Sequence, residues 1–202
     1  LGGAVTGMGV EATSFRNGLP HESVLEMDVL TGVGEIITCS PEHNVDLFRG
    51  FPNSYGSLGY TVRLKIELEE VSKYMALRHV RFHDTVSYAE AMGTIAETRE
   101  WDGVEVHGLD GVAFGPEELY LTLATKTDEE GPVSDYTREH IYYRSIQHPE
   151  GVTHDRLTTR DYIWRWDVDW FWCSRAFGAQ DPTIRKLWPR DLLRSSFYWK
   201  LI

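Results

Sequence analysis

The sequence predicts an α+β fold in two parts, because two different orders of elements follow one another along its 202 residues. Residues 1–72 alternate glycine-rich turns with strands, whereas residues 73–202 begin with the order strand, helix, strand, strand. The second order is typical of an open α+β sandwich with helices on one face of its sheet. The change of pattern near residues 69–73 therefore marks a boundary between two domains.

A β-hairpin is predicted in the first part. Residues 23–30 (SVLEMDVL) alternate apolar and polar side chains, and residues 35–39 (EIITC) follow after a short glycine-containing segment. Gly32 and Gly34 can adopt the positive φ angles that a tight turn between strands requires. The segment 23–39 is therefore expected to form two antiparallel strands.

A short helix should follow the hairpin. Ser40 is expected to cap it, with Pro41 at its first position and Gly50 at its end. A second glycine-rich loop, 53–59, then leads into an alternating strand at 60–68. Two apolar side chains of the helix are expected to face the core: Leu47 and Phe48.

The second part opens with a strand at 74–82 and a helix at 85–98 that Asp84 should cap. Strands at 104–109 and 119–125 are predicted next. The helical periodicity places five apolar residues on the buried face of the helix: Val86, Ala89, Met92, Ile95 and Ala96.

The pattern is less regular toward the C-terminus. A turn is predicted at Asp110-Gly111, a further strand at 140–146, and a helical, aromatic segment from Thr158 onward. This segment contains Trp166 and Trp170, which share one face if the segment is a helix. They are candidates for the wall of an apolar substrate pocket, and the alternative is that they fill a core or a domain contact.

Composition excludes some classes of function. The net charge is −11 and the sequence has no basic stretch, which argues against nucleic acid as a partner. Two distant cysteines, Cys39 and Cys173, favour a reducing, cytoplasmic location. No apolar run could span a bilayer, so any membrane association would come from segments outside this chain. The chain starts within a glycine-rich segment and without Met, and we interpret it as truncated at its N-terminus.

Other residues that could carry chemistry are expected to be structural. His79 and His83 lie four residues apart on a predicted strand, too far apart to share a metal, and should be surface histidines. Asp110 should be a turn charge, and Cys173 should be buried rather than nucleophilic. We expect no metal site, and no residue is assigned a catalytic role.

The segment 2–10 (GGAVTGMGV) is the most informative part of the sequence. Its glycines and small side chains would let the backbone approach a flat or anionic ligand closely. It is not a G-x-G-x-x-G motif that follows a strand, and no Walker lysine comes after it. The segment alone therefore indicates a ligand-binding loop without naming the ligand.

A longer series of motifs follows in register. It consists of the glycine-rich segment, Arg16 and Gly18, Glu26 and Asp28, Gly34 and Glu35 with Cys39 and Ser40, Asn44–Phe48, and Gly56 with Gly59. From Gly2 to about Leu68 this series resembles the second half of the FAD-binding (PCMH-type) domain of the vanillyl-alcohol-oxidase superfamily, which includes cytokinin dehydrogenases and Δ24-sterol reductases. The first half of that domain is absent from the chain.

The resemblance implies FAD as the cofactor. In the superfamily the glycine-rich segment lies along the flavin and its pyrophosphate, and the second loop closes over the cofactor. By position, the residues expected near FAD are Gly2, Gly3, Thr6, Gly9, Val10 and Tyr60. Tyr60 could equally be an ordinary strand residue, and Asn44–Phe48 is expected to cap a helix and fill a core rather than contact the ligand.

The sterol reductases are the more similar subfamily, because the resemblance continues through residues 73–82 (KYMALRHVRF), 101–114 and 161–188. It implies hydride transfer between the flavin and an apolar, sterol-like substrate, with NADPH as a candidate electron donor. The alternatives are an oxidase or dehydrogenase of an alcohol or amine, and a non-catalytic fragment without flavin. The chain alone is expected to be inactive and to bind FAD weakly or not at all.

Overall fold

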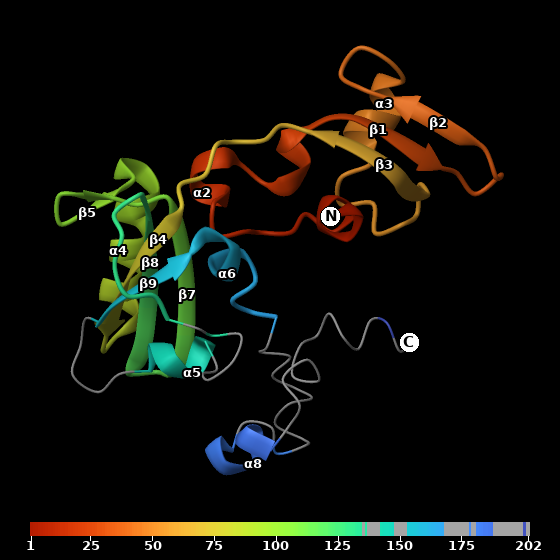
Figure 1. The fold of residues 1–202 in the computed structure, drawn as a ribbon. Helices are drawn as coiled ribbons and strands as arrows, with labels where there is room; N and C mark the ends of the chain where they lie inside the picture. The colour runs from red at the N-terminus through yellow and green to blue at the C-terminus, as the bar shows by residue number, and fades with distance from the viewer. Residues whose placement is uncertain are drawn as a thin grey trace. The chain divides into compact units, whose positions relative to one another are not determined.

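The computed structural model describes residues 1–134, 136, 142–147, 153–167, 178, 181–187 and 200. The chain divides into two compact units, Leu1–Glu70 (unit 1) and Val71–Ile202 (unit 2), which are coloured along the chain in Figure 1. Both units combine helices with antiparallel sheets, so the predicted α+β class is confirmed. None of the helices in the described ranges is long and apolar enough to cross a membrane.

Unit 1 contains a three-stranded antiparallel sheet in the order β2-β1-β3. Its strands are β1 (Val24–Leu30), β2 (Ile36–Cys39) and β3 (Tyr60–Ile66). The hairpin predicted from β1 to β2 is confirmed, with Gly34 at φ 86° in its turn. The Thr31 N–H donates to the Glu35 carbonyl at 2.8 Å and closes the turn.

Four short helices accompany this sheet. They are α1 (Gly2–Thr6), α2 (Ser14–Asn17), the 3₁₀ helix η1 (Pro20–Ser23) and α3 (Val45–Gly50). The core beneath them consists of Val5, Val24, Met27, Val29, Cys39 and Phe51, with the partly buried Leu47 and Phe48 packed against it as expected. The N-terminal glycine-rich segment, predicted to be a turn, forms the helix α1 in its first half.

The helix start predicted at Ser40 is wrong, because α3 begins at Val45. The Ser40 hydroxyl oxygen accepts hydrogen bonds from the backbone N–H groups of Glu42 and His43, at 3.2 and 3.1 Å. Serine at such a position can form a local turn as readily as a helix cap. Here the turn forms, and Asn44, in the left-handed conformation at φ 49°, precedes the helix.

The main sheet of unit 2 has the order β7-β8-β4-β9, and all its strand pairs are antiparallel. Its strands are β4 (Tyr74–Phe82), β7 (Gly108–Gly115), β8 (Glu118–Thr127) and β9 (Thr153–Thr158). The sequence analysis missed β9 and placed a turn at Asp110-Gly111, which lies inside β7. A small separate ladder pairs β5 (Glu100–Trp101) with β6 (Val104–Glu105).

The helices of the described part of unit 2 are α4 (Thr85–Thr98), α5 (Tyr142–Ile146), α6 (Thr159–Ile163) and α8 (Pro182–Leu187). Asp84 caps α4 as predicted, because its Oδ1 accepts hydrogen bonds from the N–H groups of Val86 and Ser87, at 3.0 and 2.8 Å. The buried residues of α4 are Ala91 and Ile95. Three residues predicted for the buried face are exposed instead: Val86, Ala89 and Ala96.

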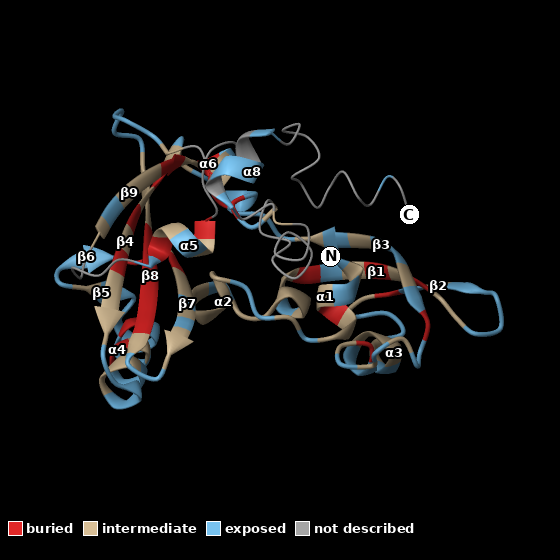
Figure 2. Ribbon diagram, turned by 90° about the horizontal axis from the view of Figure 1, so that it is seen from below, coloured by how far each residue is buried: buried red, intermediate tan, exposed pale blue. Residues whose placement is uncertain are grey.

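Both faces of the unit 2 sheet are covered, which corrects the expectation of helices on one face. Residues 119–124 of β8 are buried without interruption, as Figure 2 shows in red. A strand with only one covered face would alternate between buried and exposed residues. The helix α4 contacts β8 and β4, whereas residues of α5 and α6 belong to the cluster that contains Tyr120 and Ala124.

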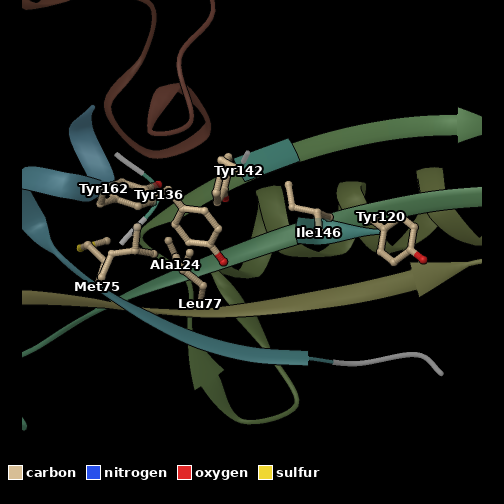
Figure 3. Packing of buried hydrophobic residues seen from close by; sticks show 9 residues of the cluster. Met75, Leu77, Tyr120, Ala124, Tyr136, Tyr142, Ile146 and Tyr162 are labelled. Carbon is tan, nitrogen blue, oxygen red and sulfur yellow. The ribbon is translucent and has the colours of Figure 1, made fainter. Parts of the chain in front are cut away.

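That cluster is a hydrophobic core of unit 2. Figure 3 shows the rings of Tyr136, Tyr142 and Tyr162 close to aliphatic side chains of β4 and β8. The segment that contributes Tyr142 and Ile146 was predicted to be a strand but forms α5. A spacing of four residues places two side chains on one face in either a helix or a strand, so the apolar pattern did not distinguish the two.

Candidate functional site

The two glycine-rich segments of unit 1 lie next to each other in space. The Tyr55 N–H donates a hydrogen bond to the Thr6 carbonyl at 3.1 Å, which joins the loop 53–59 to α1. A Cβ atom placed on Gly7 would lie 3.9 Å from Cε1 of the Tyr55 ring. Segments separated by about fifty residues in the sequence therefore form one continuous surface.

The glycines of α1 differ in what surrounds them. A Cβ atom on Gly2 would lie 2.5 Å from the Thr61 hydroxyl oxygen, so a larger residue there would require the Thr61 side chain to move. A Cβ atom on Gly9 would lie 3.3 Å from the Ala4 Cβ atom. A Cβ atom on Gly3, in contrast, would have no neighbour within 4 Å. The backbone at Gly3 is therefore open to a ligand.

Two of the other residues expected near the cofactor present apolar surface to solvent. Val10 is 78% exposed and Tyr60 is 72% exposed, and Tyr55 in the adjacent loop is 76% exposed. A Cβ atom on Gly56 would lie 3.7 Å from the Tyr60 ring, so this ring stands beside the loop. Large apolar side chains in such exposed positions are available to pack against a ligand or another segment.

The Thr6 hydroxyl is directed to its own helix. It lies 3.1 Å from the Gly2 carbonyl oxygen and 3.3 Å from the Gly3 carbonyl oxygen, and it donates its hydrogen within this pair. Its oxygen can still accept a hydrogen bond. To donate a hydrogen bond to a ligand, the Thr6 hydroxyl would have to release these carbonyls.

The second glycine-rich loop is held in an unusual backbone conformation. Asn53 and Tyr55 have φ angles of 61° and 48°, and Met8 in the first segment has 49°. Gly59 has φ 128°, and a Cβ atom there would lie 2.2 Å from the Leu30 carbonyl oxygen. For the three non-glycine residues, such conformations cost about 1–3 kcal/mol each and persist only where the surrounding structure fixes them. Here the Leu30 end of the hairpin and α1 hold the loop in place.

The charged motif on β1 has a structural partner. Arg63 of β3 contacts Asp28 at 2.6 Å and Glu26 at 2.7 Å across the sheet. The hydrogen bond from Arg63 lowers the pKa of Asp28, and a second hydrogen bond from Thr38 acts in the same direction. The two carboxylates of β1 therefore link this strand to Arg63 of β3.

In unit 2, the candidate Trp166 lies in an aromatic cluster. Its ring meets the Tyr142 ring edge to face with centroids 4.8 Å apart, and the Arg165 guanidinium carbon is 5.7 Å from its centroid. Its residue is 38% exposed. The helix α6 ends at Ile163, so Trp166 lies in the following turn and not on the predicted aromatic helix. Trp170 and Cys173 lie outside the described residues.

Two residues expected at the surface are instead shielded from solvent, one buried and one partly buried. His79 is 2% exposed, and its Nδ1 lies 2.8 Å from the Thr122 hydroxyl. Burial lowers the pKa of His79 to about 4. Its position on β4, two and four residues after the buried Leu77 and Met75, was a signal that could have revealed this, since alternate strand residues share a face. The exposed His83 follows the end of β4.

Asp110 is the second such group. Its carboxylate pairs with the guanidinium of Arg165 at 2.5 Å, with side-chain exposures of 16% and 7%. The same guanidinium carbon lies 4.0 Å from the Tyr162 ring centroid. The predicted turn charge is therefore the partly buried half of an ion pair with the buried Arg165, and this pair joins β7 to the turn after α6. Among the described residues, no group of three or more His, Cys, Asp or Glu could hold a metal ion.

Comparison with known proteins identifies relatives of the chain. No family model matches it. Cytokinin dehydrogenase 9 of Oryza sativa subsp. japonica is 37% identical over 90 residues, which are 45% of this chain and 17% of that protein. The Δ24-sterol reductase of Homo sapiens is 30% identical over 132 residues, which are 65% of this chain and 25% of that protein. The chain is a homologue of both groups.

The fold comparison agrees with this homology. A solved structure of glucooligosaccharide oxidase from Acremonium strictum, described with a 6-S-cysteinyl, 8α-N1-histidyl FAD, aligns with a TM-score of 0.53 and 14% identity. The alignment covers 81% of this chain and 34% of that one. At this identity the likeness shows a shared fold. The homology to cytokinin dehydrogenase and Δ24-sterol reductase confirms the resemblance expected from the sequence, and the chain spans at most a quarter of the length of these two curated relatives.

Proposed function

We propose that this protein is an FAD-dependent oxidoreductase. Unit 1 would form one wall of the FAD site, and unit 2 would be the first part of the substrate domain. The homology to dehydrogenases and reductases supports this proposal, as does the fold shared with an FAD-containing oxidase. It is also supported by the motifs that lie in register along unit 1.

The single observation that carries the proposal is the union of the two glycine-rich segments. The hydrogen bond from Tyr55 to Thr6 brings them together, and the open backbone at Gly3 lies on the first of them. A flat ligand can approach peptide groups closely only where no side chain intervenes. The residues present therefore fit a flavin.

When bound, FAD would supply the redox chemistry by exchanging a hydride with a substrate carbon at N5. The residues of this chain would orient the flavin and exclude water from it. Gly2, Gly3 and Gly9 would allow close approach of the backbone, while Val10 and Tyr60 would cover the ring system with apolar surface. Thr6 would offer a hydrogen-bonding oxygen.

The substrate that we propose is apolar and sterol-like, and NADPH would be the electron donor. The homology to Δ24-sterol reductase over 132 residues supports this substrate class. The partly exposed Trp166 and its aromatic neighbours in unit 2 would contribute to the apolar pocket.

The full-length protein provides the test. We expect it to purify with the yellow absorption of oxidised flavin, to be bleached by NADPH without oxygen, and to regain its colour with a Δ24-sterol. Bleaching by an alcohol or amine instead would favour an oxidase or dehydrogenase of such compounds. A full-length protein that stays colourless with added FAD would refute the flavoenzyme assignment.

The isolated 202-residue chain provides a second test. Because it contains one wall of the proposed site, we expect FAD to bind it weakly or not at all, as measured by equilibrium dialysis. Tight stoichiometric uptake by this chain would show that the other wall is unnecessary.

A further inference from the structure

Unit 1 has a concave site that the proposed flavin wall does not use. It is a cavity of about 490 Å³ between α1, η1, β1 and the α3 region. Its apolar lining consists of Val5, Met8, Val24, Met27, Pro41, Phe48 and Pro52. Small-molecule sites in proteins typically measure about 300–1,000 Å³ and are lined mainly by apolar side chains. This cavity has both properties.

The polar lining consists of three side chains. His21 contributes a ring whose Nδ1 is shielded from solvent and has no hydrogen-bond partner within the described residues. Buried polar atoms are rarely left without a partner, so a group that forms a hydrogen bond with this nitrogen would stabilise it. Arg49 contributes an exposed guanidinium, and no ion pair to it occurs in the described part of the chain.

Glu22 is the one acidic group in the lining. Its Oε2 accepts the hydrogen bond of the Leu19 N–H at 2.6 Å, so part of this carboxylate is engaged in capping η1. Its negative charge opposes an anion in the cavity, whereas Arg49 attracts one. The effects of Glu22 and Arg49 on the binding of an anion are therefore expected to be opposite, and each can be tested with its own variant.

We propose that this cavity binds a small amphipathic monocarboxylate, a fatty-acid-like molecule whose chain lies against the apolar lining. Its carboxylate would pair with Arg49 and accept a hydrogen bond from the His21 Nδ1–H. Arginine matches carboxylates in geometry as well as charge, which makes it the expected partner for such a head group. The proposal does not depend on flavin binding, because none of the proposed flavin-contacting residues lines this cavity.

The test uses the 202-residue chain and two probes of equal chain length, sodium decanoate below its micellar concentration and 1-decanol. Binding is followed by ¹H–¹⁵N NMR titration. We expect saturable shifts for decanoate confined to the cavity lining, and weaker binding of 1-decanol. Shifts spread over both units, or no shifts at all, would overturn the proposal.

Three variants locate the head group. Arg49→Gln should weaken decanoate binding about tenfold or more, since charge-assisted hydrogen bonds contribute roughly 1.5–3 kcal/mol, and should leave 1-decanol unchanged. Glu22→Gln, which keeps an oxygen for the Leu19 N–H, should strengthen decanoate binding. Lys65→Gln removes an exposed charge outside the lining and should change neither probe. Equal effects of Arg49→Gln and Lys65→Gln would contradict the assigned role of Arg49.

Discussion

The buried pair of Asp110 and Arg165 leads to the sharpest prediction about stability. In Asp110→Ala, the Arg165 side chain would stay 7% exposed in its aromatic surroundings without its carboxylate. Removing one partner of a buried ion pair costs about 3–5 kcal/mol. The guanidinium would keep its 2.7 Å hydrogen bond to the Tyr162 carbonyl and its ring contacts. We therefore expect Asp110→Ala to lower the free energy of unfolding by about 3 kcal/mol, the lower end of this range.

Tryptophan fluorescence during urea unfolding measures this loss selectively. All seven tryptophans lie in residues 101–199, so the signal reports on unit 2 alone. Glu97→Ala on the exposed face of α4 is the control, and surface substitutions of this kind usually change stability by less than about 0.5 kcal/mol. Asp110→Ala combined with Arg165→Met should be more stable than Asp110→Ala alone, because no unpaired charge remains. A loss for Asp110→Ala as small as that of the control would refute the reasoning.

Two further predictions concern His79 and the second glycine-rich loop. Because burial lowers the folded-state pKa of His79 from 6.5 to about 4, the unfolded chain binds the extra proton between these values. Its contribution to stability is therefore present above about pH 6.5 and is lost toward pH 4, by about 3 kcal/mol in total. Urea unfolding at several pH values should show a smaller loss for His79→Gln, and an unchanged loss would contradict the cause assigned. In unit 1, Gly59→Ala should greatly accelerate amide hydrogen exchange, because its Cβ would lie 2.2 Å from a carbonyl oxygen. Gly34→Ala, with open space at its Cβ, should cost only about 1–2 kcal/mol for its positive φ, and equal effects of the two would disprove the steric explanation.

The elements that the sequence predicted well are those with local signals. Asp84 precedes a long periodic helix and caps it, and the glycines between residues 30 and 35 form the hairpin turn. Both depend on hydrogen bonds between neighbours in the chain. The glycine-rich motifs of unit 1 were also informative, because their spacing along residues 2–68 was shared with a known superfamily.

The errors occurred where distant contacts decide the structure. His79 looks polar in sequence, yet β8 and β9 pair on either side of its strand, and Thr122 satisfies its ring. Asp110-Gly111 is a common turn dipeptide, but pairing with Thr122 and Leu121 of β8 extends it into a strand. The partner of Asp110 lies 55 residues away at Arg165. No local pattern could supply these partners.

The central claim, that the joined glycine-rich segments form one wall of a flavin site, is tested most directly at Gly3. Its Cβ position is free of protein atoms within 4 Å, so Gly3→Leu should fold normally while its side chain fills the space proposed for the ligand. The matched control is Gly115→Leu in unit 2, where a Cβ would also meet nothing. We predict that the full-length Gly3→Leu protein purifies folded and without flavin colour, whereas Gly115→Leu stays yellow. A folded Gly3→Leu protein with a full complement of flavin would contradict the account.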